Sequence, residues 1–148
     1  PIRKFICTRK STSTFGAFAV KIIARSLKLI LAINCGSDGP QEATLTLEVD
    51  GEEISSTARG NGPVDATFNA IKDIFPHEAE LQLYQVHAVT EGTDAQAEVT
   101  VRLKEDGKLV NGQGAHIDTL VASARAYVHA LNKLLVKRQK TSPAALTA

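Results

Sequence analysis

The sequence predicts a single α+β domain made of two β-β-β-α units, with antiparallel sheets and helices packed on one face. Two segments, 43–49 and 95–103, alternate strictly between apolar and polar residues, which is typical of strands with one buried face. Asp-Gly, a hairpin signal, follows each segment, and a Gly-x-Gly triplet and a helical apolar pattern come next. The same order of features twice in one chain indicates a duplicated unit.

Equivalent positions of the two units keep a nearly constant spacing. Asp50 pairs with Asp106, Gly60 with Gly112, and Asp65 with Asp118, at offsets of 56, 52 and 53 residues. A period near 50 residues with only two copies favours one duplicated domain over a solenoid.

The first unit is predicted to have strands at 27–34, 43–49 and about 52–58, followed by a helix. Pro63 suits the first turn of that helix, where its missing N–H costs nothing. The apolar residues then step by four, three and four positions, which defines one helical face. They are Val64, Phe68, Ile71 and Phe75, and Pro76 ends the helix.

The second unit is predicted to start with a long strand at 81–90. Its apolar positions change phase between Leu83 and Tyr84, which indicates either a bulge or a change of covering partner. Strand 95–103, the Asp-Gly turn and a short strand lead to a turn at 112–114. The last helix is expected over 117–137 and carries an apolar stripe that includes Ile117, Leu120, Val121, Ala124, Val128, Leu131 and Leu135.

Composition limits the classes of function. The 148 residues are 43% hydrophobic and 5% aromatic, without Trp or Met, so the core must rest on Ala, Val, Leu and Ile. The formal net charge is +1, and seven cations precede Asp38, the first acidic residue. The rest of the chain has 10 cations against 16 acids, a net of −6. This balance, without basic and aromatic residues interleaved, argues against a nucleic-acid partner.

The N-terminal segment 1–26 has no assigned role. It is rich in Arg, Lys, Ser and Thr and lacks acids, as organelle transit peptides do, and a linker or a cloning remnant would fit it equally well. The most apolar stretch, 15–33, is interrupted by Lys21, Arg25 and Lys28, so no membrane span is expected. Residues 139–148 are expected to be a flexible tail.

The two Gly-x-Gly triplets are the most suggestive chemical feature. Glycine allows a ligand to approach the backbone closely, and a helix that begins next exposes N–H groups that attract a carboxylate. A plain strand-to-helix turn without a ligand explains the same pattern. Asp65 and Asp118 are predicted in the first turns of their helices, where they either complement the helix dipole or receive a ligand's ammonium group.

The sequence offers no catalytic or metal site. His77, His87, His116 and His129 share no ligand spacing, and Ser123 lies among alanines, where small residues allow close helix packing. Two cysteines, Cys7 and Cys35, are too few for a disulfide framework and are expected to be reduced thiols in a cytoplasmic protein. No cofactor is therefore expected in this chain.

Four runs carry a family resemblance: CGSDGPQEATLTLEVDG (35–51), GNGPVDATFNAI (60–71), LYQVHAVTEGTDAQAEVTVRL (83–103) and GQGAHIDTLVASARAYVHALNKLL (112–135). Together they resemble the C-terminal regulatory domain of 2-isopropylmalate synthase, and citramalate synthase has a similar domain. The resemblance covers about residues 27–138. It implies a homodimer that binds leucine, or isoleucine in the citramalate synthase case, and so inhibits a catalytic barrel. The divalent metal and acetyl-CoA belong to that barrel, which needs roughly 200 residues or more and is absent from this chain.

The resemblance also implies an effector pocket near the junction of the two units. Carried over by position, its residues are Asn61, Gly62, Val64, Asp65, Leu81, Tyr84, Ala88, Ala95, Ala97 and, as a weaker transfer, Ile117. A leucine-sensing domain, an isoleucine-sensing domain and a structural dimerisation module with a vestigial pocket all remain compatible with the sequence.

Overall fold

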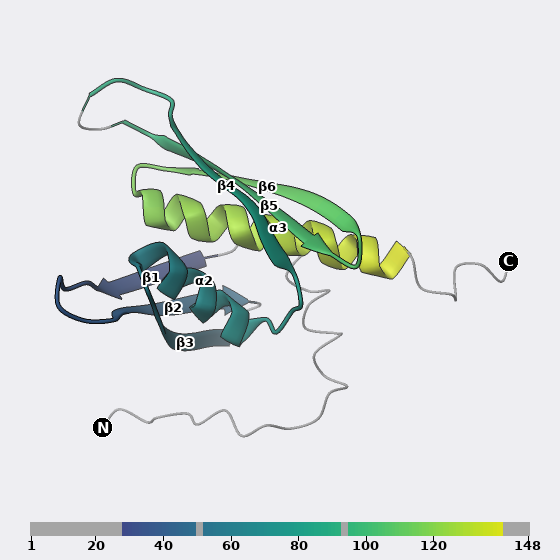
Figure 1. Cartoon of the computed structure of the whole chain (residues 1–148), viewed down its shortest axis with the longest axis horizontal. Coiled ribbons are helices and arrows are strands. Elements are labelled where there is room, and N and C mark those ends of the chain that lie inside the picture. Colours follow the sequence, from purple (N-terminus) through teal and green to yellow (C-terminus); the bar gives the residue numbers. More distant parts are fainter. Residues whose placement is uncertain (1–27, 50–51, 93–94, 141–148) are drawn as a thin grey trace, which may run out of the picture.

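The computed structural model describes residues 28–49, 52–92 and 95–140 (Figure 1). The segment 1–26, the first Asp-Gly turn at 50–51 and the end of the tail at 141–148 lie outside the described residues. The predicted α+β class with two β-β-β-α units is confirmed.

The first unit is a three-stranded antiparallel sheet with one helix. Its strands are β1 (Lys28–Asn34), β2 (Gln41–Val49) and β3 (Glu52–Gly60), in the order β1-β2-β3. The alternating residues of β2 place Ala43, Leu45 and Leu47 on the buried face. Helix α2 (Pro63–Ile74) packs against β2 and β3 on that face.

The second unit repeats this arrangement with a longer helix. Its strands β4 (Glu80–Ala88), β5 (Ala97–Glu105) and β6 (Lys108–His116) form a second three-stranded antiparallel sheet, in the order β4-β5-β6. Helix α3 (Thr119–Lys140) runs along β5 and β6. Of the two explanations for the phase change in the first strand, the bulge is confirmed, because the register of β4 on β5 shifts between Leu81 and Leu83.

One core joins the two units. Leu45 and Leu47 of the first sheet and Val99 and Val101 of the second belong to the same buried cluster, and α2 and α3 contact each other (Figure 1). The α3 side of the core is lined by alanines, which allow the helix to approach β6 closely. Aliphatic and small residues thus make up most of the core, as the composition predicted.

The two glycines of the second triplet do not form a turn, and the prediction that they do is wrong. Gly112 and Gly114 lie inside β6, opposite Val101 and Val99. A Cβ atom on Gly112 would lie 2.0 Å from the Ala126 carbonyl oxygen, and one on Gly114 would lie 2.4 Å from that of Ala122. These glycines are therefore needed for close helix packing and not for a ligand-binding loop.

The start of α3 also differs from the prediction. The helix begins at Thr119, so Ile117 precedes it, and Asp118 is its N-cap instead of a first-turn residue. The Asp118 carboxylate accepts a 2.8 Å hydrogen bond from the N–H of Leu120, which satisfies one of the free amides at this end. At the other end the helix continues to Lys140, so residues 139 and 140 are helical and not part of a tail.

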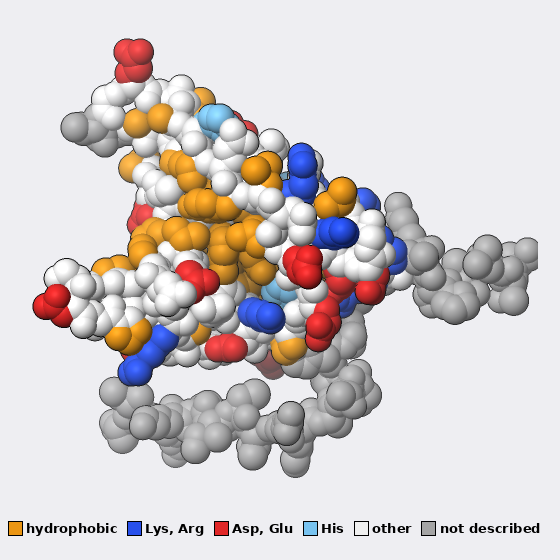
Figure 2. Space-filling view, in the orientation of Figure 1, with side chains coloured by type: hydrophobic (Ala, Val, Ile, Leu, Met, Phe, Trp, Pro, Cys, Tyr) orange, Lys and Arg blue, Asp and Glu red, His pale blue; other side chains and the backbone are white. Residues whose placement is uncertain are grey.

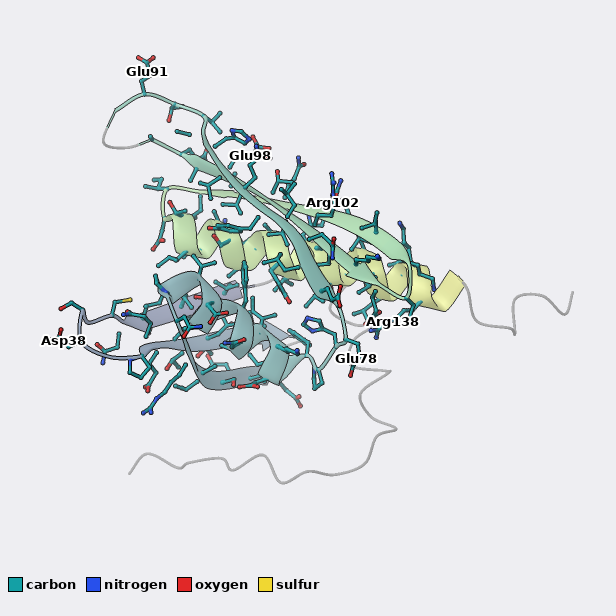
Figure 3. The ribbon with its side chains drawn as sticks, in the orientation of Figure 1. Asp38, Glu78, Glu91, Glu98, Arg102 and Arg138 are labelled. Atoms are coloured by element: carbon teal, nitrogen blue, oxygen red, sulfur yellow. The ribbon has the colours of Figure 1, made fainter. Side chains whose placement is uncertain are left out.

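The linker between α2 and β4 is anchored to the second unit. The His77 ring contacts the Phe75 carbonyl oxygen (2.6 Å) and the Tyr127 hydroxyl (2.8 Å). Glu105, which is 6% exposed, accepts a hydrogen bond from the N–H of Glu78 and pairs with Arg138 near the end of α3. Figure 3 shows Glu78 and Arg138 side by side at this end of the molecule. These contacts fix the position of the second sheet relative to α2.

Candidate functional site

Tyr84 occupies the junction between the two units. It lies on β4 opposite Val101, so its ring is on the core side of the second sheet. The ring of Phe68, from α2, meets the Tyr84 ring edge-on at a centroid distance of 5.8 Å. The Tyr84 hydroxyl lies 2.8 Å from Oγ of Ser123 on α3. One half-buried side chain therefore touches elements of both units.

The hydrogen-bond roles at Tyr84 follow from its partner. Ser123 Oγ donates to the Thr119 carbonyl oxygen at 2.6 Å, because a carbonyl can only accept. The Ser123 oxygen is then left to accept from Tyr84 Oη–H. Since Ser123 is fully buried inside α3, this bond fixes the Tyr84 ring against a rigid element.

Small and aliphatic residues continue the same face of β4 and β5. Val86 lies opposite Val99 and Ala88 opposite Ala97, so all four share the core side with Tyr84. Ala97 is 8% exposed, but Val86 is 41% exposed and Ala88 is exposed too, because α3 covers β5 and β6 and leaves this part of β4 open.

The apolar face that stays open at the junction is here called the junction hollow. Its residues are Val64, Tyr84, Val86, Ala88 and Ala97. Val64 is half-buried and lies one turn before Phe68 on the apolar face of α2. Figure 2 shows hydrophobic side chains gathered between the upper sheet and the lower unit, where the surface is hollowed. Of the ten predicted effector residues, Tyr84, Ala88 and Ala97 thus share one face of the second sheet, and Val64 lies on the face of α2 that meets Tyr84 through Phe68.

Three more of those residues form the entry to α2. Gly62 is the N-cap in an extended conformation and offers no side-chain cap to the amides of the first turn. Asp65 lies in that turn, and its Oδ2 accepts a 2.9 Å hydrogen bond from the N–H of Asn61. The loop is therefore held by Asp65, and the uncapped helix start keeps the capacity to bind an anion such as a carboxylate.

The remaining predicted residues lie apart from this group. Leu81 is 44% exposed and lies opposite Leu103, on the other side of the bulge from Tyr84. Ala95 is half-buried in the connection before β5, where its N–H reaches the Gly92 carbonyl oxygen at 3.3 Å. Ile117 is 67% exposed, just before α3. Among the residues that the structure describes, these three belong neither to the buried core nor to the apolar side chains packed against it.

Sequence reasoning missed the role of Ser123 as a partner of Tyr84. One signal was available, because Thr67 of α2 and Ser123 of α3 are 56 residues apart, the same offset as the two Asp-Gly turns. Both are fully buried, and both donate to the carbonyl oxygen four residues earlier, Thr67 to Pro63 at 2.7 Å. A small hydroxyl residue at this position is therefore a feature of both units.

The titratable groups with shifted pKa values are His77 of the anchored linker and two residues that contact the linker, Tyr127 and Glu105. Burial lowers the pKa of His77, and the charges of Lys72 and Arg138 act in the same direction, against the Phe75 carbonyl and Glu105. Burial raises the pKa of Tyr127 to about 12. For Glu105 burial acts to raise the pKa, but the hydrogen bond and charge of Arg138 outweigh it, so this pKa lies below its usual value.

A neutral His77 fits these contacts. Nδ1 must carry the proton that the Phe75 carbonyl accepts, which leaves Nε2 to accept from the Tyr127 hydroxyl. The ring of Tyr127 stacks on Phe68 at 4.5 Å, and Phe68 in turn meets Tyr84. A continuous row of aromatic contacts therefore runs from the linker to the junction hollow.

The described residues contain neither a metal-binding cluster nor a membrane-spanning helix. Within residues 28–49, 52–92 and 95–140, no group of three or more His, Cys, Asp or Glu side chains is arranged to hold a metal ion. None of the helices in these ranges combines the length and the hydropathy that a membrane crossing requires.

Comparison with known proteins identifies relatives. A 2-isopropylmalate synthase of Caulobacter sp. (strain K31) is 61% identical over 118 residues, which cover 80% of this chain and 22% of that protein. The enzyme of the same name from Bradyrhizobium sp. (strain BTAi1 / ATCC BAA-1182) is 61% identical over 112 residues, 76% of this chain and 21% of that protein. The chain thus spans about a fifth of the length of these relatives.

The match to solved structures is weak. A solved chain with both double-stranded-RNA-binding domains of DRB4 matches with a TM-score of 0.27 and 11% identity, over 87% of this chain and 94% of that one.

A family model describes most of the chain. The model for the LeuA allosteric (dimerisation) domain matches residues 24–135, which include both sheets and the junction hollow. The predicted dimeric character agrees with the family's description. With this match and relatives at about 60% identity, the chain belongs to the LeuA allosteric (dimerisation) domain family.

Proposed function

We propose that this chain is the amino-acid-sensing regulatory domain of a 2-isopropylmalate synthase, and that it binds leucine at the junction hollow. The observation that carries the proposal is the position of Tyr84. This side chain shares an open apolar face with small residues of β4 and β5 and meets Phe68 of α2, a helix whose N-terminus has no side-chain cap, in a chain about 60% identical to synthases of this name.

The chemistry of leucine matches these parts. A free amino acid needs a site for its carboxylate, an acceptor for its ammonium group and a slot for its side chain. The first-turn amides of α2 provide the site for the carboxylate, and Asp65 or nearby backbone carbonyls accept hydrogen bonds from the ammonium group. Val64, Tyr84 and Val86 form the walls of the slot, and the small side chains of Ala88 and Ala97 leave room for a branched alkyl group.

A homodimer is part of the proposal. The junction hollow is apolar and open in one copy of the chain, and large exposed apolar surfaces are typical of interfaces. Ile117, 67% exposed, lies two residues before the start of α3, as Asn61 lies two residues before the start of α2. We infer that a second copy covers the hollow and that Ile117 reaches the pocket in this assembly.

The activity that leucine would control lies elsewhere in the longer polypeptide. We expect a catalytic barrel with its divalent metal and acetyl-CoA there, inhibited when leucine binds this domain, and no condensation by this chain alone. A cytoplasmic location also belongs to the proposal, because Cys35 is an exposed free thiol.

Calorimetric titration with leucine, isoleucine and valine tests the proposal. Leucine is expected to bind most tightly, and valine more weakly because one methylene in an apolar pocket is worth about 1–3 kcal/mol. Tighter binding of isoleucine would indicate the effector of a citramalate synthase. A folded dimer that binds none of the three would be a structural dimerisation module. Release of CoA from acetyl-CoA with any 2-oxo acid would contradict the expected lack of catalysis.

A further inference from the structure

Within the part of the chain that the structure describes, β6 pairs only with β5 and is therefore an edge strand of the second sheet. The carbonyl groups of alternate residues, Leu109, Asn111, Gln113 and Ala115, point away from β5 at this edge. An edge of this kind is a template for pairing with a strand of another chain, and proteins usually block it.

Basic side chains of α3 occupy this edge at a regular interval. Lys137 Nζ donates to the Leu109 carbonyl oxygen (2.7 Å) and Lys133 Nζ to that of Asn111 (2.8 Å). His129 Nδ1 lies 3.0 Å from the Gln113 carbonyl oxygen and 3.2 Å from the Gln113 nitrogen. Arg125 Nη1 reaches the Ala115 carbonyl oxygen at 3.5 Å. These four residues are here called the α3 basic row.

The spacing has a simple geometric origin. Four residues of an α-helix rise about 6 Å, and two residues of a strand about 6.8 Å. Because α3 runs antiparallel to β6, each step of four along the helix meets a step of two along the strand. The row therefore contacts carbonyl groups along the whole length of the edge, instead of only one of them.

The first unit has one contact of the same kind between its helix and its third strand. Asn69 of α2 donates to the Arg59 carbonyl oxygen at 3.0 Å, and this pair is related to Arg125 and Ala115 by the offset of 56 residues. The next equivalent position of α2 holds Asp73, an acid that cannot donate to a carbonyl when ionised, and α2 ends at Ile74, before the equivalents of Lys133 and Lys137. The basic row is thus a property of the second unit.

The surroundings of the row are positively charged. An open groove of about 830 Å³ runs between β6 and α3, and none of the described residues that line it is acidic. Its lining includes Arg102, whose Nε donates to the side-chain oxygen of Asn111 (2.9 Å), and Lys133, whose partner is a neutral carbonyl. Figure 3 shows Arg102 projecting from the second sheet near this edge. Two copies that met along β6 would bring two such rows of like charge together.

We propose that the α3 basic row closes the β6 edge against strand addition by a second copy of this chain. The side chains satisfy the carbonyl groups that an added strand would need, and their charge repels the same edge of another copy. Self-association is then confined to other surfaces. The proposal concerns only the β6 edge and holds whether or not leucine binds the junction hollow.

The test removes the donors and keeps the aliphatic stems. In the 148-residue chain, Lys133→Met with Lys137→Met exposes the carbonyl groups of Leu109 and Asn111. Sedimentation velocity over a tenfold range of concentration should show species larger than those of the wild type, increasing with concentration. The matched control is Lys104→Met with Lys72→Met, two exposed lysines outside the row, which should sediment like the wild type.

A third change separates strand pairing from nonspecific association. Adding Asn111→Pro to the row variant blocks the opened edge, because proline has no N–H and obstructs a pairing strand. The wild-type sedimentation pattern should return. A folded row variant that sediments like the wild type would overturn the proposal, as would larger species that persist in the folded proline variant or appear equally in the control.

Discussion

The hydroxyl of Tyr84 lies 2.8 Å from Oγ of Ser123, although the two residues are 39 positions apart in the chain. This bond joins the edge strand β4 to the first turns of α3, and the Tyr84 ring also meets Phe68 of α2. The Tyr84 side chain therefore contacts both helices, and its position depends on how they lie relative to each other. Any ligand that contacts Tyr84 in the junction hollow is coupled to the packing of the two units.

The Tyr84–Ser123 bond should be measurable as a coupling. Tyr84→Phe and Ser123→Ala are each expected to lower the free energy of unfolding by about 1 kcal/mol, the usual contribution of one hydrogen bond. In the double variant the losses should not add, because both changes remove the same bond. Urea unfolding of the four proteins measures this. Thr67→Val, in the equivalent position of α2, is the control and should add to Tyr84→Phe; additivity at Ser123 as well would mean that the bond contributes nothing.

Gly112 should tolerate no side chain. In Gly112→Ala the new Cβ would meet backbone atoms of α3, 2.0 Å from the Ala126 oxygen and 2.5 Å from the Ala130 nitrogen, so the helix must move away from β6. Overpacking of this kind typically costs about 1–3 kcal/mol. Gly39→Ala is the matched control, because nothing lies within 4 Å of its added Cβ, and it should change stability by less than about 0.5 kcal/mol. Equal urea midpoints for the two variants would contradict the packing argument.

The elements of this fold could be predicted where burial imposes a period on the sequence. Strands β2 and β5 alternate because one face contacts the core, and the apolar face of α2 is visible for the same reason. Gly112 was misread because a glycine in a strand usually marks a turn. Glycine is required at position 112 because α3 passes within contact distance of β6. The residues that make this contact, Ala126 and Ala130, come 14 or more positions later in the sequence.

The candidate site could be predicted only in part. Tyr84, Ala88 and Ala97 share a face because of strand register, which alternation reveals. The partnership with Ser123 depends on how α3 lies across the sheet, and no local pattern encodes it. The separation of Ile117 from the other site residues likewise follows from the start of α3 at Thr119, which Asp118 fixes by capping.

His77 should make the stability of the domain depend on pH. Its folded-state pKa is below the ordinary 6.5, first because the ring is buried. Between that folded-state pKa and 6.5 the unfolded chain binds more protons than the folded chain, so the free energy of unfolding rises with pH in this window. Above the window the contribution of His77 to stability is fully present. His77→Gln should remove this part of the slope in urea unfolding between about pH 5 and 8. His87→Gln, an exposed position on β4, is the control; an unchanged slope in the His77 variant would contradict the assignment.

Dimerisation should depend on the junction hollow. Val86 is 41% exposed on the core side of the second sheet, and Val86→Asp would place a charge in the middle of the inferred interface. Sedimentation velocity should then show a monomer where the wild type is a dimer. Ile30→Asp is the control, because Ile30 is 51% exposed and lies on the opposite face of the first sheet from its core residues. If the Ile30 variant dissociates and the Val86 variant does not, the interface lies on that outer face instead.

Leucine should stabilise the domain, and Ala97→Phe should remove the effect. A ligand at about 100 times its Kd adds roughly 2.7 kcal/mol to the free energy of unfolding, which thermal unfolding detects as a higher Tm. Ala97 lies on the core side of β5 opposite the exposed Ala88, so a phenyl ring at this position would extend into the volume proposed for the leucine side chain. The ring can fill an open slot, so the unliganded variant should melt near the unliganded wild type and show no rise with leucine.

The matched control for this experiment is Ala115→Phe. Ala115 is exposed on β6 and pairs with Glu98, so its side chain is on the other face of the same sheet. This variant should keep the full leucine response. A response that survives in Ala97→Phe would mean that leucine binds away from the junction hollow. A loss of folding in Ala97→Phe, at a residue only 8% exposed, would mean that this alanine is ordinary core, and Ala88→Phe at the exposed neighbour then becomes the variant that must abolish the response.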